Sequence, residues 1–203
     1  MQNLLNKREL NEIKKLLKKF LKLDQNYSKI ALTRYLSVFH PHFIVWVSAM
    51  QNAVTSPIGK YAAEDNILLE LSENHQDMLL DFMKQMEITP CPKEYSYLKP
   101  AIDRINAVNL YGVKNKQGAG PAMVIYLLED LSKVFIPWME KIAIQNKAEN
   151  LLYIKKHGEA DVKHSRLAYE AVIAEYIPCQ EHDRQILNAS DGVVQLLDLI
   201  FNK

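Results

Sequence analysis

The chain has 203 residues, with 25 Lys and Arg against 24 Asp and Glu, and its net charge of +1 gives no reason to propose nucleic acid or a membrane surface as a partner. This length is enough to bury one hydrophobic core, so a single domain over residues 1–203 is expected. Cys91 and Cys179 are too far apart for a CxxC pair, and no window approaches the roughly 20 apolar residues of a membrane span, so we expect a cytoplasmic protein without disulfides.

Helical periodicity begins near the N-terminus. In residues 9–23, ELNEIKKLLKKFLKL, apolar side chains recur at three- and four-residue steps with lysines on the other side, which predicts an amphipathic surface helix. Two more helices are expected over residues 26–39 and 42–54. They are separated near His40 and Pro41 because the residue before a proline is pushed out of the helical region.

The middle of the chain predicts one long helix and one shorter helix. Ser56 and Pro57 open the long one, which continues through residues 60–86 and stops before the prolines that follow. Residues 97–112 then predict a helix that ends at Gly112.

Three helices are expected in the last third of the chain. A loop rich in glycine precedes the apolar run 122–143, and a further helix covers residues 150–176. The last helix is expected over residues 190–201, with Ser190 and Asp191 as capping residues. Since no segment alternates like a strand, the predicted class is all-α, a bundle of seven to eight helices.

The segment HGEADVKH holds His157, Asp161 and His164 at relative positions 0, 4 and 7. An α-helix turns about 100° per residue, so these three side chains share one stripe. Imidazole nitrogen and carboxylate oxygen are ligands that suit non-haem iron and related divalent metals. A solvated helix face would explain the same three residues, so ligands from facing helices have to be sought.

Two other helices offer such ligands. Glu129 lies within the apolar run VIYLLEDL, where a carboxylate is costly to bury without a partner, although an outward position is an equal alternative. His75 lies on the apolar side of its helix, and Glu70 is the nearest upstream carboxylate expected to point inward. Five residues span about 140° on a regular helix, so a π-bulge would be needed to bring Glu70 and His75 together.

These motifs in this order resemble the haem-oxygenase-like diiron oxidases and oxygenases, the CADD-like group within the TENA/THI-4 superfamily. The resemblance runs from about residue 42 to 176 and covers AEDNILLELSENHQDMLLDF, VIYLLEDLS and YIKKHGEADVKHSRLAYEA. It implies a haem-oxygenase-like bundle with the metal ligands Glu70, His75, Glu129, His157, Asp161 and His164.

Two positions need comment against the family pattern. The commonest spacing would place a carboxylate at Leu68 or Ser72, so Glu70 is the first choice for that ligand and Asp65 the alternative. Tyr153, one turn before His157, resembles the near-metal tyrosine of CADD-like members and is the candidate catalytic side chain. A core tyrosine with a paired hydroxyl is the simpler explanation of that residue.

The resemblance implies an oxidoreductase that uses Fe(II), two per chain, or manganese, to activate dioxygen and oxidise a small organic substrate. Candidate cavity walls, each of which core packing also explains, are Trp46, Met50, Met123, Tyr126 and Trp138.

Two other classes stay open. Metal-free TenA-like hydrolases of the same fold use a cysteine nucleophile, for which only Cys91 or Cys179 is available. A helical interaction protein would need neither metal nor turnover. Haem is less favoured, because the histidines beside Pro41 flank an expected helix break. Metal content separates these classes.

We predict a homodimer, because a chain that is 48% hydrophobic has apolar helix surface available for pairing. Light scattering should give twice the 23.4 kDa mass of one chain. A mass of one chain at micromolar concentration would contradict this prediction.

Overall fold

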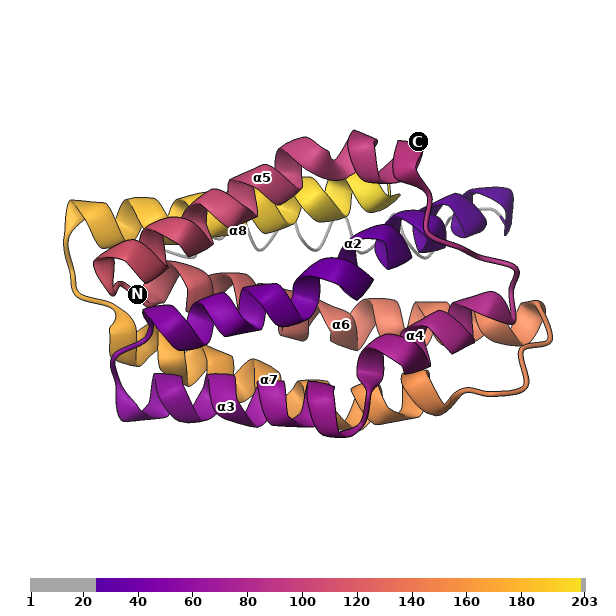
Figure 1. The fold of residues 1–203 in the computed structure, drawn as a ribbon, viewed down its shortest axis with the longest axis horizontal. Coiled ribbons are helices and arrows are strands. Elements are labelled where there is room, and N and C mark those ends of the chain that lie inside the picture. Colours follow the sequence, from indigo (N-terminus) through magenta and orange to yellow (C-terminus); the bar gives the residue numbers. More distant parts are fainter. Residues whose placement is uncertain (1–24, 202–203) are drawn as a thin grey trace.

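The computed structural model of the protein describes residues 25–201, which form seven α-helices and no strand (Figure 1). The predicted all-α class is therefore confirmed. The helix expected over residues 9–23 lies outside the described residues. Within residues 25–201, no helix is both long and apolar enough to cross a membrane. The helices are α2 (Gln25–Ala53), α3 (Pro57–Ser72), α4 (His75–Lys84), α5 (Pro92–Asn115), α6 (Ala119–Gln145), α7 (Leu152–Glu175) and α8 (Gln180–Phe201).

The bundle is built around α6. This helix packs most extensively against α7 and also contacts α2, α5 and α8. Most of its side chains are buried, and a narrow stripe that includes Lys133, Pro137, Lys141 and Ile144 is exposed. Figure 1 shows α5 and α8 along one side of the bundle and α3 and α7 along the other, with α2 and α6 between them. The expected helices 122–143 and 150–176 are confirmed as α6 and α7.

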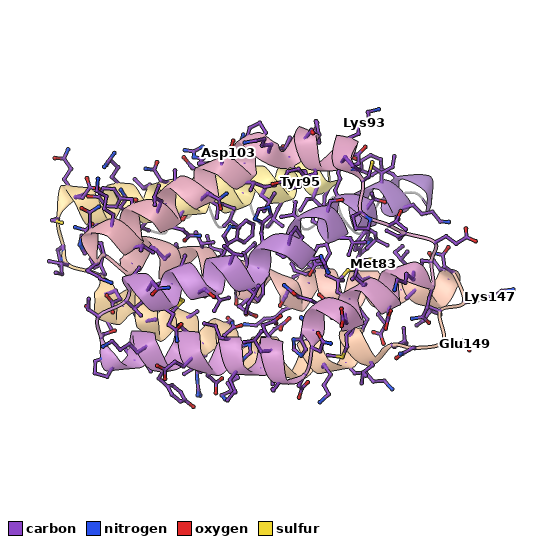
Figure 2. The ribbon with its side chains drawn as sticks, in the orientation of Figure 1. Met83, Lys93, Tyr95, Asp103, Lys147 and Glu149 are labelled. Carbon is purple, nitrogen blue, oxygen red and sulfur yellow. The ribbon has the colours of Figure 1, made fainter. Side chains whose placement is uncertain are left out.

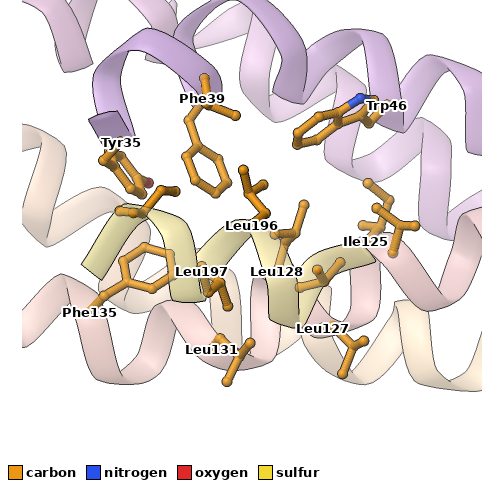
Figure 3. Close-up of a cluster of buried hydrophobic side chains, with 14 of the residues drawn as sticks. Tyr35, Phe39, Trp46, Ile125, Leu127, Leu128, Leu131, Phe135, Leu196 and Leu197 are labelled. Carbon is orange, nitrogen blue, oxygen red and sulfur yellow. The ribbon is translucent and has the colours of Figure 1, made fainter. Parts of the chain in front are cut away.

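Aromatic and leucine side chains fill the space between α2, α6 and α8 (Figure 3). The rings of Tyr35 and Phe39 stack with their centroids 4.3 Å apart, and Phe39 meets Trp46 edge to face at 6.4 Å. Leu196 and Leu197 of α8 are almost completely buried below these rings. Each such side chain contributes about 1.5–3 kcal/mol by leaving water, so this cluster fixes how the three helices pack.

Charged side chains remain outside the bundle. Lys93, Asp103, Lys147 and Glu149 project from its periphery, whereas Met83 is completely buried (Figure 2). Carboxylates inside the core are therefore the exception.

The predicted interruption near His40 and Pro41 is wrong, because α2 continues through Pro41. Its ribbon changes direction near the middle (Figure 1), as expected where a proline removes a backbone hydrogen bond. Phe39 and Trp46 are both buried in the same core, so packing holds the two halves in one helix. Gln76 of α4 donates to the backbone carbonyl of His40 at 3.0 Å, which stabilises the backbone beside the proline.

The predicted long helix after Ser56 is also wrong in part. Ser56 does cap α3, since its hydroxyl accepts from the backbone N–H of Gly59 at 3.1 Å. The helical pattern through residues 60–86 is broken at Asn74, which adopts a left-handed conformation with φ of 52° and ψ of 50°. A second helix, α4, begins directly after it. Asparagine is one of the few residues that occupy this conformation readily.

The predicted bounds of α5 and α8 differ from the structure. α5 begins at Pro92 instead of residue 97, because a proline fits the first turn of a helix, and it continues past Gly112 to Asn115, where Lys116 in a left-handed conformation ends it. α8 begins at Gln180 instead of residue 190, because its buried stripe starts in the first turn; Ser190 is buried within the helix. Capping signals therefore mark possible ends, and burial of the apolar stripe decides between them.

We predict opposite effects of alanine at two helical glycines. A Cβ at Gly112 would lie 2.5 Å from Cγ of Pro121, so Gly112→Ala should lower the free energy of unfolding by about 1–3 kcal/mol. Gly158 in α7 has nothing within 4 Å of the same position, so Gly158→Ala should raise it by about 0.5–1 kcal/mol. Urea denaturation measures both. Equal changes in the two variants would mean that the close approach of α5 and α6 at Gly112 and Pro121 does not exclude a side chain, and would contradict the prediction.

Candidate metal centre

Four helices bring the predicted ligands to one region of the interior. Of the six, five are buried, and the side chain of His157 is 13% exposed. Glu129 is only 4% exposed, so its outward alternative is wrong. The contributions are Glu70 from α3, His75 from α4, Glu129 from α6, and His157, Asp161 and His164 from α7.

The six side chains form two groups, one of Glu70, His75 and His157 and the other of Glu129, Asp161 and His164. Within each group, one donor atom per residue lies within 4.8 Å of the others. The stripe on α7 thus serves both groups, with His157 in the first and the other two residues in the second.

The break at Asn74 explains how Glu70 and His75 meet. Glu70 lies in the last turn of α3, His75 is the first residue of α4, and His75 Nδ1 lies 2.9 Å from Glu70 Oε1. The break between the two helices therefore brings these side chains together, and the expected π-bulge is not needed. Asp65, the alternative carboxylate, lies in neither group, although its Oδ2 is 3.4 Å from His164 Nε2.

The second group contains a buried oxygen that no described residue hydrogen-bonds. Glu129 Oε1 accepts from Asn66 Nδ2 at 2.6 Å and lies 3.7 Å from His164 Nδ1. Within residues 25–201, Asp161 Oδ2 is buried without a hydrogen-bond partner. Burying such an atom costs free energy unless a cation or a proton offsets its charge.

Burial raises the pKa of both carboxylates of the second group. Burial, followed by the charge of Asp161, raises the pKa of Glu129 well above its usual value. Burial and the charge of Glu70 raise the pKa of Asp161. Both shifts report negative charge confined in a medium of low dielectric constant, where a bound cation would be stabilising.

Two of the three histidines are neutral in this environment. Burial, followed by the charge of His75, lowers the pKa of His157 to about 3, and burial lowers the pKa of His164. Burial also disfavours charged His75, but Glu70 and Glu73 outweigh it and raise its pKa. A neutral imidazole keeps a lone pair for a metal, so three imidazoles and three carboxylates form a donor set that suits iron or manganese.

A cavity adjoins these groups; the empty space in and around it, open solvent included, is about 520 Å³. None of the five expected wall residues lines it. Its apolar walls are phenylalanine and leucine side chains from α2, α4 and α6. The sequence does not predict that they line one cavity, because the cavity forms only when these helices pack together. The apolar walls are Phe39, Phe43, Leu79, Leu128 and Phe135.

Tyr153 lies where the cavity meets the first group. Its ring centroid is 4.1 Å from that of His157, and its hydroxyl is 3.1 Å from the hydroxyl of Tyr35. Burial, followed by Tyr35, raises the pKa of Tyr153 well above its usual value. The residue is thus a buried aromatic with a paired hydroxyl that also faces the candidate site.

The two cysteines lie elsewhere. Cys179 is exposed, Cys91 is half-buried, and neither lines the cavity. No geometry of the described residues therefore favours a cysteine nucleophile at this site.

Comparison with known families agrees with this geometry. The sequence profile of a family described as "iron-containing redox enzyme" matches residues 31–198. The chain belongs to this family, whose members have the haem-oxygenase-like fold. Comparisons with curated proteins and with solved structures give no significant match.

The left-handed residue between α3 and α4 gives a testable prediction. Asn74→Val should lower the free energy of unfolding by about 1–2 kcal/mol relative to Asn74→Gly, because a β-branched side chain clashes in this conformation. Both variants lose the hydrogen bond from Asn74 to Asp77, so their difference isolates the backbone. Urea denaturation measures it, and equal stability of the two variants would contradict the prediction.

Proposed function

We propose that the two groups each bind one iron ion and that the protein is a non-haem diiron oxidase or oxygenase. The observation that carries the proposal is the unpartnered Asp161 Oδ2, buried beside the Glu129 carboxylate and the His164 imidazole. A buried carboxylate oxygen without a hydrogen bond is destabilising unless a metal ion or proton is bound to it. Membership of the iron-containing redox family supports iron as that metal.

Each residue has a stated part in this proposal. Glu70, His75 and His157 would hold one metal ion, and Glu129, Asp161 and His164 the other. When bound, the two ferrous ions would supply electrons for the reduction of dioxygen. The hydrogen bond from Asn66 orients Glu129, and the apolar walls exclude water from the reacting substrate.

The cavity defines the class of substrate that we propose. Phenylalanine and leucine side chains form its apolar walls, which favours a small molecule with an apolar or aromatic body. Polar contacts are offered by His40 and Gln76 and by the hydroxyls of Tyr35 and Tyr153. Tyr153 adjoins His157, so we place it in contact with the reacting part of the substrate.

We expect protein loaded anaerobically with ferrous iron to bind two equivalents, one for each group, and to change its visible absorption on exposure to oxygen. Asp161→Ala and His164→Ala should each remove at least one equivalent with little loss of helix content, because each takes a donor from the second group. Glu70→Ala should remove iron from the first group. Elemental analysis and circular dichroism measure these changes.

Glu175 provides a matched control. It is a buried carboxylate on the same helix, but it accepts hydrogen bonds from the backbone N–H groups of Thr55 and Ser56. Glu175→Gln should therefore keep both iron equivalents. The proposal fails if the unmodified protein binds less than about 0.1 equivalents of iron or manganese under conditions that saturate such sites, or if both alanine variants keep full metal content.

A further inference from the structure

Glu73 and Asp65 lie outside the metal groups, and each contacts both a histidine of one group and a lysine of α7. Glu73 Oε2 lies 3.3 Å from His75 Nε2, while its other oxygen pairs with Lys156 Nζ at 2.9 Å. Asp65 Oδ2 lies 3.4 Å from His164 Nε2, while its other oxygen pairs with Lys163 Nζ at 2.6 Å. Each arrangement thus joins a lysine of α7, a carboxylate of the 57–74 segment and a histidine of one group.

The opposite nitrogen of each ring faces the metal group. His75 Nδ1 lies 2.9 Å from Glu70 Oε1, and His164 Nδ1 lies 3.7 Å from Glu129 Oε1. A neutral imidazole has one N–H and one lone pair, so a carboxylate that accepts from Nε2–H leaves the lone pair on Nδ1, directed at the metal group.

The third histidine has a different outer partner. His157 Nδ1 lies 3.2 Å from the backbone carbonyl of Tyr153, and its Nε2 lies 4.0 Å from Glu70 Oε1. Its orientation therefore depends on the backbone of α7 and needs no second side chain. Of the three histidines, His75 and His164 are therefore the two that have a carboxylate from outside the metal groups beside Nε2.

We propose that Glu73 and Asp65 are positioning residues, one for each metal, which fix the tautomer and ring orientation of His75 and His164. Lys156 and Lys163 hold these carboxylates in place from the surface groove that all four side chains line. The inference rests on the proposed function, since it concerns histidines that bind metal. It gives Asp65 a role different from that of a direct ligand.

The test measures the affinity of the full-length protein for ferrous iron alone, by anaerobic competition with a chelator. Asp65→Asn and Glu73→Gln keep the shape of the side chain but remove its charge. Each should raise the Kd of one metal equivalent by about 10–100-fold and leave the other unchanged. Asp103→Asn is the control, because Asp103 also pairs with a lysine, at 2.5 Å, but on the exposed face of α5 (Figure 2).

Combined variants assign each carboxylate to its histidine. On a His164→Ala background, Asp65→Asn should cause no further loss, because the ring that it positions is gone. On a His75→Ala background, the same substitution should weaken the remaining equivalent by the full factor. A purely structural role for Asp65 would weaken binding equally on both backgrounds and would overturn the proposal.

Lys163→Ala keeps the test decisive if a carboxylate variant does not fold. This lysine is exposed, so its removal should preserve the fold and cause a smaller loss in the same equivalent as Asp65→Asn. If the unmodified protein binds two equivalents and all three variants stay within about twofold of its Kd values, the positioning role is wrong and the diiron proposal stands. If the unmodified protein binds no metal, both proposals are wrong.

Discussion

The electrostatic cost of placing Glu129 and Asp161 together inside the bundle is the constraint on which the candidate site depends. Both are at least 95% buried, and burial raises the pKa of each; the charge of Asp161 further raises the pKa of Glu129, and the charge of Glu70 that of Asp161. Glu175 shows how the same chain handles a buried carboxylate with a structural role, since backbone N–H groups and the Thr55 hydroxyl satisfy its oxygens. Asp161 Oδ2 has no such partner among the described residues. In the proposed function, a metal ion supplies the compensation that hydrogen bonds supply to Glu175.

The position of α6 explains why this cost cannot be avoided by turning a side chain outward. Glu129 lies on the side of α6 that the neighbouring helices cover and is only 4% exposed, so its carboxylate is held away from solvent. The stripe of α7 that carries Asp161 and His164 then faces Glu129 as a consequence of how these two helices pack. Asn66 of α3 completes this environment from a third helix. The site is therefore a property of the packing of the whole bundle, which is why residues from four helices contribute to it.

Much of the site was predictable because it depends on local spacing. His157, Asp161 and His164 share a stripe in any regular helix. A glutamate within an apolar run, such as Glu129, is expected to be paired or to bind a metal if it is buried. The meeting of Glu70 and His75 was harder, because the segment has helical periodicity on both sides of Asn74 and nothing local requires the left-handed residue. Tertiary contacts likewise decide that α2 crosses Pro41 and that α8 begins before Ser190. The cavity walls were missed for the same reason, since their shared position is created by packing.

The site borders two different surroundings. The cavity has aromatic walls and borders Glu70, His75, Glu129, His157 and Asp161, whereas the groove between α3 and α7 borders His164 and combines four charged side chains with Leu68, Leu69 and Ala160. An oxidation that generates reactive species benefits from an apolar side that holds substrate away from water. In our proposal, the charged groups on the other side fix the orientation of the histidines. Tyr153 lines the cavity and Asp65 lines the groove, so in our proposals Tyr153 faces the substrate whereas Asp65 positions a metal-binding histidine.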